Sequence, residues 1–354
     1  MDLLKLNTNR VWRTYLGGKK LDLFLSNTDT VDTHYPEEWI GSVVKAINPD
    51  YKDNEGLSTI DLKDGTKTTL LDLIKLNPKE MLGESHVNKY GCDTGVLIKI
   101  LDAAERLSIQ VHPDKEKAKS LFNSSFGKTE AWHILEGRNI DGERPHIYLG
   151  FKEGITRELW KDKFHKQDIN GMLDLMHKIY VKPGETYLIE GGMPHAIGTG
   201  CFIIEIQEPT DYTVRVERST INGYNIPDNL CHQGLGFEHM FDCFSYAGYT
   251  EDEILARWKL KSHCSSSEQC LISYDDTKCF AMDKIIVNKN CKIRDTDNFS
   301  VLLVLKGKGT LICNNDEMVI EKGDKIFIPS YVKDIECVSD DKTEIIRCFP
   351  PKDK

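Results

Sequence analysis

The feature that most constrains the fold is a series of short runs in which apolar and polar residues alternate. Residues typical of turns (Gly, Pro, Asn and Asp) separate these runs along most of the chain. Alternation with a period of two places apolar and polar side chains on opposite faces of a strand. The sequence therefore predicts a mainly β protein built as an antiparallel sandwich or barrel. The clearest runs are VLIKIL, LSIQVH, HIYLGF, KIYVKPGETYLIEGG, CFIIEIQE, YTVRVER, FSVLLVLKGKGTLI, MVIEKGDKIFIPS and TEIIRCF.

Two segments have helical spacing instead. TKTTLLDLIKLNPKEML (66–82) predicts a helix that ends at Pro78, because proline cannot continue a helix. TRELWKDKFHKQDINGMLDLMHKI (156–179) predicts two short helices that are broken near Asn170 and Gly171. The apolar residues at helical intervals in the second segment are Leu159, Trp160, Phe164, Met172, Met176 and Ile179.

A pattern near the middle of the chain returns near its end. VKPGETYLIEGGMPHAIG (181–198) and IEKGDKIFIPSYVKDIEC (320–337) each place Gly and an acid at a turn before a strand. The first copy leads into His195, whereas the equivalent position in the second copy lies near Lys333 or Asp334, and no histidine follows His263. Either the chain holds a duplicated barrel whose second copy has lost its metal-binding residue type, or two ordinary turns share Gly and an acid.

Charge and cysteine content limit the class of protein. The net charge of -10 argues against a nucleic-acid partner, which would require a basic surface. The N-terminal residues lack the pattern of a signal peptide, and no window is apolar enough for a membrane span, so we expect no membrane partner. The 11 cysteines are scattered singly, which suits a reducing compartment, and we expect a cytoplasmic protein.

The polar residues of LSIQVH are unusual for a strand that faces water. Ser108, Gln110 and His112 alternate with apolar residues, where an exposed face would normally carry Lys, Glu or Thr. Glu130 follows 18 residues after His112, and His195 follows a Gly-Gly-Met-Pro turn. Two imidazoles, a carboxylate and an amide suit zinc, or iron or manganese in a two-His-one-carboxylate set. The alternative is an ordinary solvated face, since a single histidine is more often a surface residue than a ligand.

The run CFIIEIQEPTDYTVRVER adds two charged candidates. Alternation places Glu205 opposite its apolar neighbours, and after a turn it places Arg215 on the polar face of the next strand. Both side chains can therefore point into one cavity. The alternative is a cross-strand salt bridge on the solvent side, which would contribute little to stability.

Four motifs, in order and in register, resemble the type I mannose-6-phosphate isomerases, and most closely their short bacterial form. The motifs are LSIQVHPDKEKAK, GKTEAW, PHAIGTG and EIQEPTDYTVRV, and the resemblance extends from NRVWRTYLGGKKL and PEEWIGSV through the end of the chain. It implies a bicupin fold with two jelly-roll β-barrels and a small helical portion. We expect a catalytic cupin domain with helical segments over residues 1–250. A cupin-like barrel that lacks metal ligands is then expected over 251–354, and 262–269 is the best candidate for a linker.

The resemblance also implies the site residues. Its metal ligands match His112, Glu130 and His195, with Gln110 as either a fourth ligand or a looser neighbour. The family's catalytic arginine matches Arg215, its acidic partner matches Glu205, and the lysine of its K-x-E motif matches Lys128. Ser108 and Lys99 match positions that hold the substrate phosphate. One divalent metal, zinc, and a small sugar phosphate are the expected cofactor and substrate, while monomer and homodimer both stay open.

The residue types fit the reaction that the resemblance implies. An aldose and a ketose interconvert when a proton moves between C1 and C2 through an enediol or enediolate, which requires a base and a stabilised negative charge. A metal ion stabilises that charge, Arg215 adds to it or grips the phosphate, and Glu205, or next Lys128, serves as the base. Two other functions stay open: a non-catalytic cupin that binds or senses a sugar phosphate, and a metal-dependent oxygenase.

The sequence departs from the family at two places. Ile197 stands where longer members carry a tyrosine, so a hydroxyl cannot contribute there. After Arg215 the chain reads VERSTINGYN instead of the Tyr- and Asp-rich run of the bacterial form. We expect these departures to affect substrate specificity more than the metal site.

Overall fold

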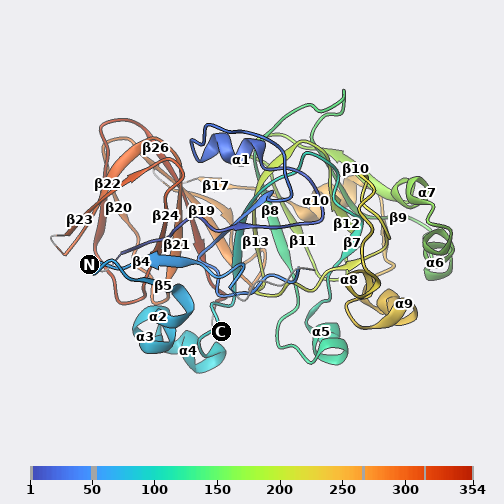
Figure 1. Cartoon of the computed structure of the whole chain (residues 1–354), viewed down its shortest axis with the longest axis horizontal. Coiled ribbons are helices and arrows are strands. Elements are labelled where there is room, and N and C mark those ends of the chain that lie inside the picture. The colour runs from blue at the N-terminus through green and yellow to red at the C-terminus, as the bar shows by residue number, and fades with distance from the viewer. Residues whose placement is uncertain (1–2, 49–53, 265–267, 315, 353–354) are drawn as a thin grey trace.

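The structure is a computed structural model that describes residues 3–48, 54–264, 268–314 and 316–352. It is mainly β, as the alternating runs predict, and its helices are short (Figure 1). The strands form four larger sheets and one hairpin, β4 (Thr59–Asp61) with β5 (Lys67–Thr69). Neighbouring strands are antiparallel throughout these pairings, except β15 (Gly248–Tyr249), which runs parallel to the β9 strand of the second sheet.

Sheets I and II build the half of the molecule that carries the candidate ligands. In spatial order, sheet I contains β16 (Lys259–Leu260), β11 (Thr186–Ile189), β8 (Glu130–Gly137), β13 (Cys201–Gln207), β6 (Leu97–Asp102), β3 (Glu37–Ile40) and β2 (Arg10–Val11). Sheet II contains β10 (Met176–Tyr180), β9 (His146–Lys152), β12 (His195–Ile197), β7 (Gln110–Val111) and β14 (Val214–Arg215).

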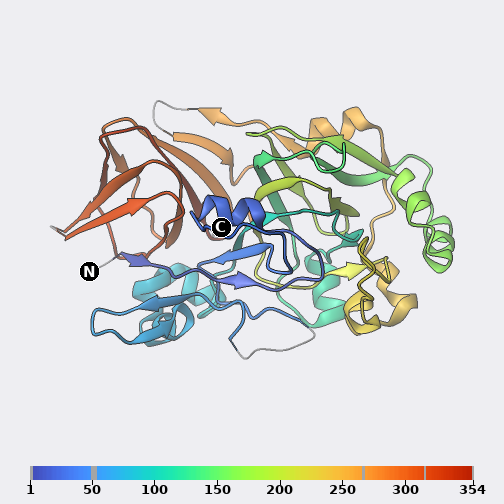
Figure 2. The same cartoon turned by 45° about the horizontal axis from the view of Figure 1, so that its top comes forward.

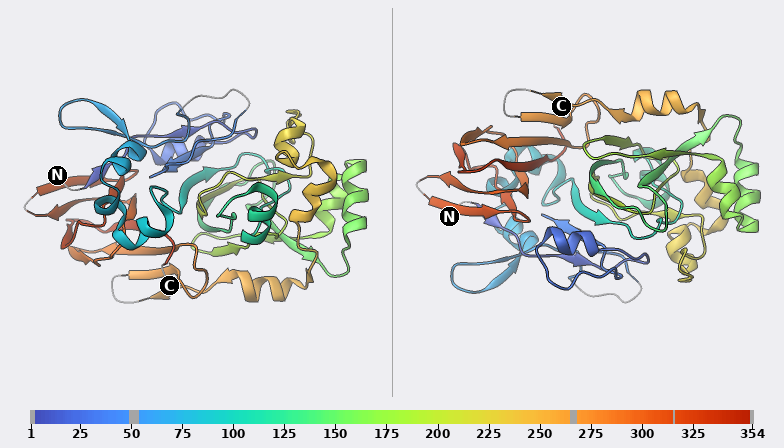
Figure 3. Two further views of the ribbon diagram at one scale, coloured as in Figure 1. Left: turned by 90° about the horizontal axis from the view of Figure 1, so that it is seen from below. Right: turned by 90° about the horizontal axis from the view of Figure 1, so that it is seen from above.

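Sheets III and IV build the other half. Sheet III contains β1 (Leu4–Lys5), β24 (Lys325–Ile328), β21 (Ser300–Lys306), β26 (Thr343–Phe349), β19 (Ala281–Val287), β18 (Glu268–Ile272) and β17 (His263–Cys264). Sheet IV contains β20 (Asn290–Ile293), β25 (Ile335–Val338), β22 (Lys308–Cys313) and β23 (Asp316–Glu321). The two halves lie side by side along the long axis, and the N-terminal strand β1 belongs to the C-terminal half (Figures 2 and 3).

Sheets I and III pack against each other through a shared apolar core. Ile204 and Ile206 of β13 belong to this core, and so do Phe299, Phe327 and Ile346 of the other half. Because side chains alternate along a strand, Glu205 projects from the opposite face of β13, toward sheet II. Both faces of sheet I are therefore buried, so the polar residues of one face line the interior of the first half instead of meeting solvent.

Helices cover the outside of this arrangement. Below the sheets lie α2 (Leu70–Leu76), α3 (Pro78–Leu82), α4 (Glu84–Tyr90) and α5 (Lys115–Phe122), and α1 (Lys19–Phe24) lies above them (Figure 1). The remaining helices are α6 (Arg157–Lys166), α7 (Ile169–Asp174), α8 (Asp228–His232), α9 (Gly236–His239), the 3-10 helix η1 (Met240–Cys243) and α10 (Glu251–Trp258). None of the helices in the described part of the chain is long and apolar enough to cross a membrane.

Three local predictions need correction. The first helix ends before Pro78 as expected, but Pro78 itself begins α3, because proline is well suited to a first helical turn. The break in the second segment lies at Gln167 and Asp168, where Gln167 is left-handed (φ 48°) and Asp168 caps α7. Met176 and Ile179 belong to strand β10 and not to a helix.

The run LSIQVH is also shorter as a strand than its alternation predicts. Only Gln110 and Val111 pair within sheet II, because the amide of Ile109 donates to the Glu217 carboxylate and Pro113 ends the run. The predicted linker falls partly in strands β17 and β18, and residues 265–267 lie outside the described residues. The division at residue 250 stays a prediction.

Candidate active site

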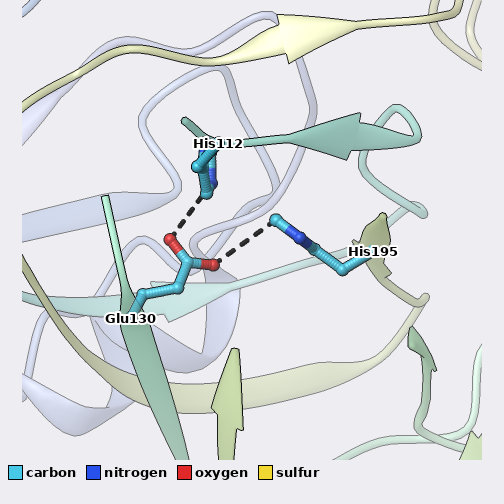
Figure 4. A group of neighbouring side chains, drawn as sticks. All are labelled: His112, Glu130 and His195. Carbon is cyan, nitrogen blue, oxygen red and sulfur yellow. Dashed lines mark ion pairs between the residues drawn. The ribbon is translucent and has the colours of Figure 1, made fainter. Parts of the chain in front are cut away.

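Three strands of the first half bring the predicted metal ligands together. Glu130 is the first residue of β8, His195 is the first residue of β12, and His112 directly follows β7. All three side chains are buried, and their ligand atoms lie within 4.8 Å of one another. Glu130 Oε2 is 3.1 Å from His112 Nε2, and Glu130 Oε1 is 3.5 Å from His195 Nε2 (Figure 4). These separations are close to the roughly 3.4 Å between ligands around a tetrahedral metal with bonds of about 2.1 Å.

Hydrogen bonds on the far side of each imidazole orient it toward this point. The Nδ1 atoms of His112 and His195 lie 2.8 Å from the carbonyl oxygens of Tyr212 and Met193, respectively. A carbonyl only accepts, so each Nδ1 carries the proton and each Nε2 keeps its lone pair. Burial, and then the neighbouring Lys128, lower the pKa of His112 to about 3, and burial lowers the pKa of His195. Both imidazoles are therefore neutral, as metal ligands must be.

The surroundings of Glu130 fit a bound cation. Its Oε1 atom is buried and has no hydrogen-bond partner in the described part of the chain. Burial alone would raise the pKa of Glu130, but Lys128 and His112 hold it well below its usual range. The Lys128 ammonium lies 2.7 Å from both Glu130 Oε2 and His112 Nε2, so the geometry already favours positive charge here. Two nitrogen donors and an anionic oxygen form a mixed set that suits one divalent metal.

Gln110 lies beside this set, in register with His195 across sheet II. Its amide nitrogen is 3.3 Å from His195 Nε2. The oxygen and nitrogen of a side-chain amide are nearly the same size, so a 180° rotation of the Gln110 amide directs its oxygen toward the ligand set instead of its nitrogen. The geometry therefore places Gln110 where a fourth ligand or a close neighbour is expected.

A cavity adjoins the ligand set and is lined by the other predicted residues. Glu205, Arg215, Lys128, Ser108 and Lys99 all line it. The solvent-side alternative for Glu205 and Arg215 is therefore wrong, because Glu205 is buried and both side chains contact the same interior space.

Glu205 sits in a buried network at the floor of this cavity. Its Oε1 accepts from Lys99 Nζ at 2.8 Å, and its Oε2 accepts from Trp132 Nε1 at 3.1 Å. Burial raises the pKa of Glu205, and Lys99 offsets part of that rise. A carboxylate with a raised pKa is a stronger base than one in water, which suits proton transfer.

Arg215 is held at the cavity wall by backbone carbonyls. Its NH1 donates to Thr213 at 3.1 Å and to Leu230 at 2.8 Å, and β14 pairs Arg215 with Gln110. Nearby, Glu217 accepts two bonds from Arg106 and one from the amide of Ile109. The buried Arg106–Glu217 pair therefore holds the Ser108–Gln110 segment in position beside the cavity. The alternation of apolar and polar residues could not predict this role.

Several cavity residues were missed at the level of sequence. Arg13, Tyr15, Glu37 and Asp211 line the cavity, and Trp39 lies directly behind it. Glu37 accepts from Tyr15, Trp39 and Arg13 at 2.9, 2.8 and 3.0 Å. Their only sequence signal was the family resemblance, since Arg13 and Tyr15 lie in NRVWRTYLGGKKL, Glu37 and Trp39 in PEEWIGSV, and Asp211 in EIQEPTDYTVRV.

The Arg13–Glu37 pair makes stability depend on acid pH. Burial would raise the pKa of Glu37, but Arg13 and Lys99 lower it from the ordinary 4.5 to about 2. Because the folded pKa is depressed, the stabilisation is complete above pH 4.5 and is lost as pH falls toward 2. We expect Glu37→Gln to remove this contribution of about 3 kcal/mol at neutral pH. Denaturant unfolding at pH 7 and pH 3 checks this, and an equal destabilisation at both pH values would contradict it.

The second half repeats the strand order of sheet I without its ligands. Gly184 (φ 89°) and Gly323 (φ 93°) occupy equivalent turns in the two halves. When these turns are aligned, the strand order β11, β8, β13, β6 of sheet I corresponds to the order β24, β21, β26, β19 of sheet III. The pairings Ile189–Glu130 and Ile328–Ser300 then place Ser300 at the position of Glu130. The pairings Trp132–Glu205 and Leu302–Arg347 place Arg347 at the position of Glu205. Among the described residues, no second cluster of potential metal ligands occurs.

Comparisons with known families match both halves of the chain. Residues 26–129 match the type I phosphomannose isomerase catalytic domain, and residues 272–350 match the mannose-6-phosphate isomerase cupin domain. Together these two stretches span just over half of the chain. The first stretch contains Gln110 and His112, and it ends immediately before Glu130.

Individual relatives carry the same name. The chain is 36% identical over 141 residues to the Bacillus subtilis protein named "Probable mannose-6-phosphate isomerase GmuF", an alignment that covers 39% of this chain and 42% of that relative. It is 27% identical over 266 residues to the mannose-6-phosphate isomerase of Streptococcus mutans, covering 74% of this chain and 76% of the relative. A zinc-bound mannose 6-phosphate isomerase structure superposes with a TM-score of 0.76, at 16% identity, over 99% of this chain and 100% of that one. This last likeness concerns the fold.

Proposed function

The chain belongs to the type I mannose-6-phosphate isomerase family, and on that premise we propose that it interconverts mannose-6-phosphate and fructose-6-phosphate. The observation that carries the proposal is the position of the buried His112–Glu130–His195 set beside a cavity that contains Glu205 and Lys128. Isomerisation needs a proton acceptor next to a centre that stabilises negative charge, and both lie here. A sugar-phosphate sensor or an oxygenase would not require a buried carboxylate of raised pKa at this place.

The cofactor is one divalent metal ion, zinc, held by His112, Glu130 and His195, with Gln110 beside them. When bound, zinc supplies positive charge that stabilises an oxyanion developing on C1 or C2 of the sugar. The two imidazoles are neutral and fixed by their Nδ1 hydrogen bonds, so Glu130 contributes the only negative charge of the set. The site therefore keeps a net positive charge once the metal is bound.

Glu205 is the proposed base. One of its carboxylate oxygens takes the proton from C1 or C2 and returns it to the neighbouring carbon, which completes the isomerisation. Trp132 Nε1 and Lys99 Nζ hold the carboxylate in place on either side. Lys128 is the second candidate, because its Nζ atom lies beside the ligand set and its amine can accept the proton from the sugar once the ammonium has released one.

Arg215, Ser108 and Lys99 bind the substrate in this proposal. Arg215 uses NH1 for backbone carbonyls, which leaves the rest of its guanidinium directed at the cavity, where it stabilises the enediolate or the phosphate. Ser108 and Lys99 contribute hydroxyl and ammonium donors on the same cavity wall. Small sugar phosphates are the partners of this site.

We also infer that the two halves are the two jelly-roll barrels of a bicupin, formed mainly by residues 1–250 and 251–354, while β1 and β16 each pair with a sheet of the other half. The repeated strand order of sheets I and III supports this architecture. A cytoplasmic location belongs to the same proposal, and it is supported by eleven cysteines that are all free thiols.

The proposed function is tested by loading the protein with zinc and following fructose-6-phosphate formation from mannose-6-phosphate in a coupled assay. We expect turnover by the parent, its loss after zinc is removed with a chelator, and its recovery when zinc is added back. His195→Ala is the control and should show no turnover at any zinc concentration. A zinc-loaded parent that binds the sugar phosphate without converting it would contradict the enzyme and leave a binding protein.

A further inference from the structure

One donor in the cavity has no acceptor. The guanidinium of Arg13 is buried, yet its NH2 nitrogen forms no hydrogen bond within the described part of the chain. The carboxylate oxygen Asp211 Oδ2 is 3.6 Å from this nitrogen, which is an ion-pair distance but too long for a hydrogen bond. A buried charged donor without an acceptor is unfavourable, and such a group next to a substrate cavity is well placed to bind the ligand. We propose that Arg13 is a substrate-specificity residue that donates from NH2 to the phosphate group of the sugar, an inference that rests on the proposed function.

Strand register defines a row of residues that lies one step away from the ligand set. Glu130 is paired with Gln207 of β13, and Glu205 lies two residues earlier on that strand, level with Lys99 and Trp39. Two residues of a strand span about 7 Å, so the row formed by Glu205, Lys99 and Trp39 lies about that far along the strands from Glu130. This row is called the second row below. A hexose 6-phosphate carries its phosphate at the end opposite C1 and C2. With its reacting carbons beside Glu130 and Glu205, the phosphate therefore extends away from the ligand set.

Arg13 reaches over this second row. Its guanidinium lies 4.9 Å from the centroid of the Trp39 ring, and the Lys99 ammonium lies 5.2 Å from the same centroid. The two cations therefore lie against one aromatic ring, that of the buried Trp39. Lys99 is already engaged by Glu205, whereas the Arg13 NH2 is buried and donates to no described residue.

The rest of the Arg13 side chain is fixed before any substrate binds. Its Nε donates to Glu37 at 3.0 Å, and its NH1 donates to Asn48 at 3.1 Å. The Arg13 backbone amide donates to the His34 carbonyl oxygen at 2.8 Å, and the His34 Nδ1 atom lies 2.8 Å from the Arg13 carbonyl oxygen. A guanidinium held in this way loses little side-chain entropy when it binds an anion.

The cavity is lined by four basic side chains and three acidic ones, so an anionic group can be accommodated here. The basic ones are Arg13, Lys99, Lys128 and Arg215, and the acidic ones are Glu37, Glu205 and Asp211. The carboxylate of Glu37 is saturated by its three donors, and both oxygens of Glu205 are hydrogen-bonded. Arg13 and Arg215 line the same cavity and both keep guanidinium nitrogens that the described residues do not use. A local excess of donors is what allows a chain with a net charge of -10 to attract a phosphate.

Arg13→Gln is the test, measured on the zinc-loaded protein with mannose-6-phosphate. We expect KM to rise about 10- to 100-fold, as for loss of one charge-assisted hydrogen bond, while kcat falls less than about fivefold. The affinity for inorganic phosphate as a competitor should fall with the rise in KM. Unphosphorylated mannose, which lacks the group that Arg13 binds, should be turned over or bound equally by parent and variant.

Two variants keep the test decisive. Arg157→Gln removes an arginine that is also paired with a carboxylate, Asp242 at 2.6 Å, but lies outside the cavity, and it should leave KM unchanged. Arg13→Lys keeps the charge opposite Glu37 but lacks the second terminal nitrogen, so it carries the test if Arg13→Gln does not fold. It should raise the KM for mannose-6-phosphate in the same direction.

The failure of this inference can be separated from the failure of the proposed function. If the parent has no isomerase activity, the proposed function is wrong, and calorimetric titration with mannose-6-phosphate still measures what Arg13 contributes to binding. A lower affinity in the Arg13 variants then supports the inference. Unchanged KM and unchanged affinity for phosphate in a folded Arg13 variant would overturn it and reduce Arg13 to a partner of Glu37.

Discussion

Glu130→Gln is expected to give a folded protein that no longer retains zinc and whose kcat is lower by about 10³-fold or more. Glu130 is the only anion in the ligand set, and it is fully buried between two neutral imidazoles. Glutamine has the same size but no charge, so the set loses the electrostatic attraction for a divalent cation and leaves the Lys128 ammonium without its counterion. Metal content after dialysis and kcat measured at saturating substrate check both parts of the expectation.

The matched control for this variant is Glu190→Gln. Glu190 accepts from Trp258 Nε1 at 2.9 Å, and it is not among the residues that line the cavity. Its replacement should leave zinc content and kcat unchanged. Stoichiometric zinc and parental kcat in Glu130→Gln would show that the zinc is held by other residues.

Glu205→Gln is expected to lower kcat by about 10²- to 10⁴-fold without loss of zinc, which is the range for removal of a general base. The carboxylate is level with Trp132 and Lys99 in sheet I and does not belong to the ligand set, so metal binding should survive. Glutamine can still accept from Lys99 or Trp132, which limits the structural damage. Parallel measurements of kcat, KM and zinc content separate the loss of a base from the loss of the site.

Lys128→Met decides between the two candidate bases. If Glu205 moves the proton, Lys128→Met should affect kcat less than Glu205→Gln does. A Glu205→Gln variant that keeps kcat within about fivefold of the parent, together with a Lys128→Met variant that is nearly inactive, would transfer the role of base to Lys128.

The alternation of CFIIEIQE was sufficient to predict which face of its strand carries Glu205. It could not tell whether that face meets solvent, because this depends on sheet II and on the packing of sheet III behind sheet I. The run LSIQVH places Gln110 and His112 on one face, and the structure brings His112 together with Glu130 and His195, although a hydrogen bond to Glu217 limits the strand to two paired residues. The pattern therefore indicated which side chains lie close together better than it indicated the length of the strand.

Arg13 and Glu37 illustrate what the sequence did not show. They pair across 24 residues, and both are buried charges whose favourable placement depends on Trp39 of the same strand as Glu37 and on Lys99 and Asp211 from two other segments. A pattern of alternating apolar and polar residues does not identify charged residues that form ion pairs in the protein interior. The break between α6 and α7 was misplaced for a local reason, since the sequence favours Gly171 as a breaker whereas the structure uses the left-handed Gln167 and the Asp168 cap.

The most direct test of the proposed isomerase is the fate of the C2 hydrogen of mannose-6-phosphate, followed by proton NMR in D₂O with the zinc-loaded protein. We expect formation of fructose-6-phosphate with some solvent deuterium at C1, because Glu205 holds the transferred proton where it can exchange before it returns. Glu205→Gln should slow both product formation and deuterium incorporation. A zinc-loaded parent that leaves mannose-6-phosphate unchanged, with its C2 hydrogen intact, would contradict the isomerase.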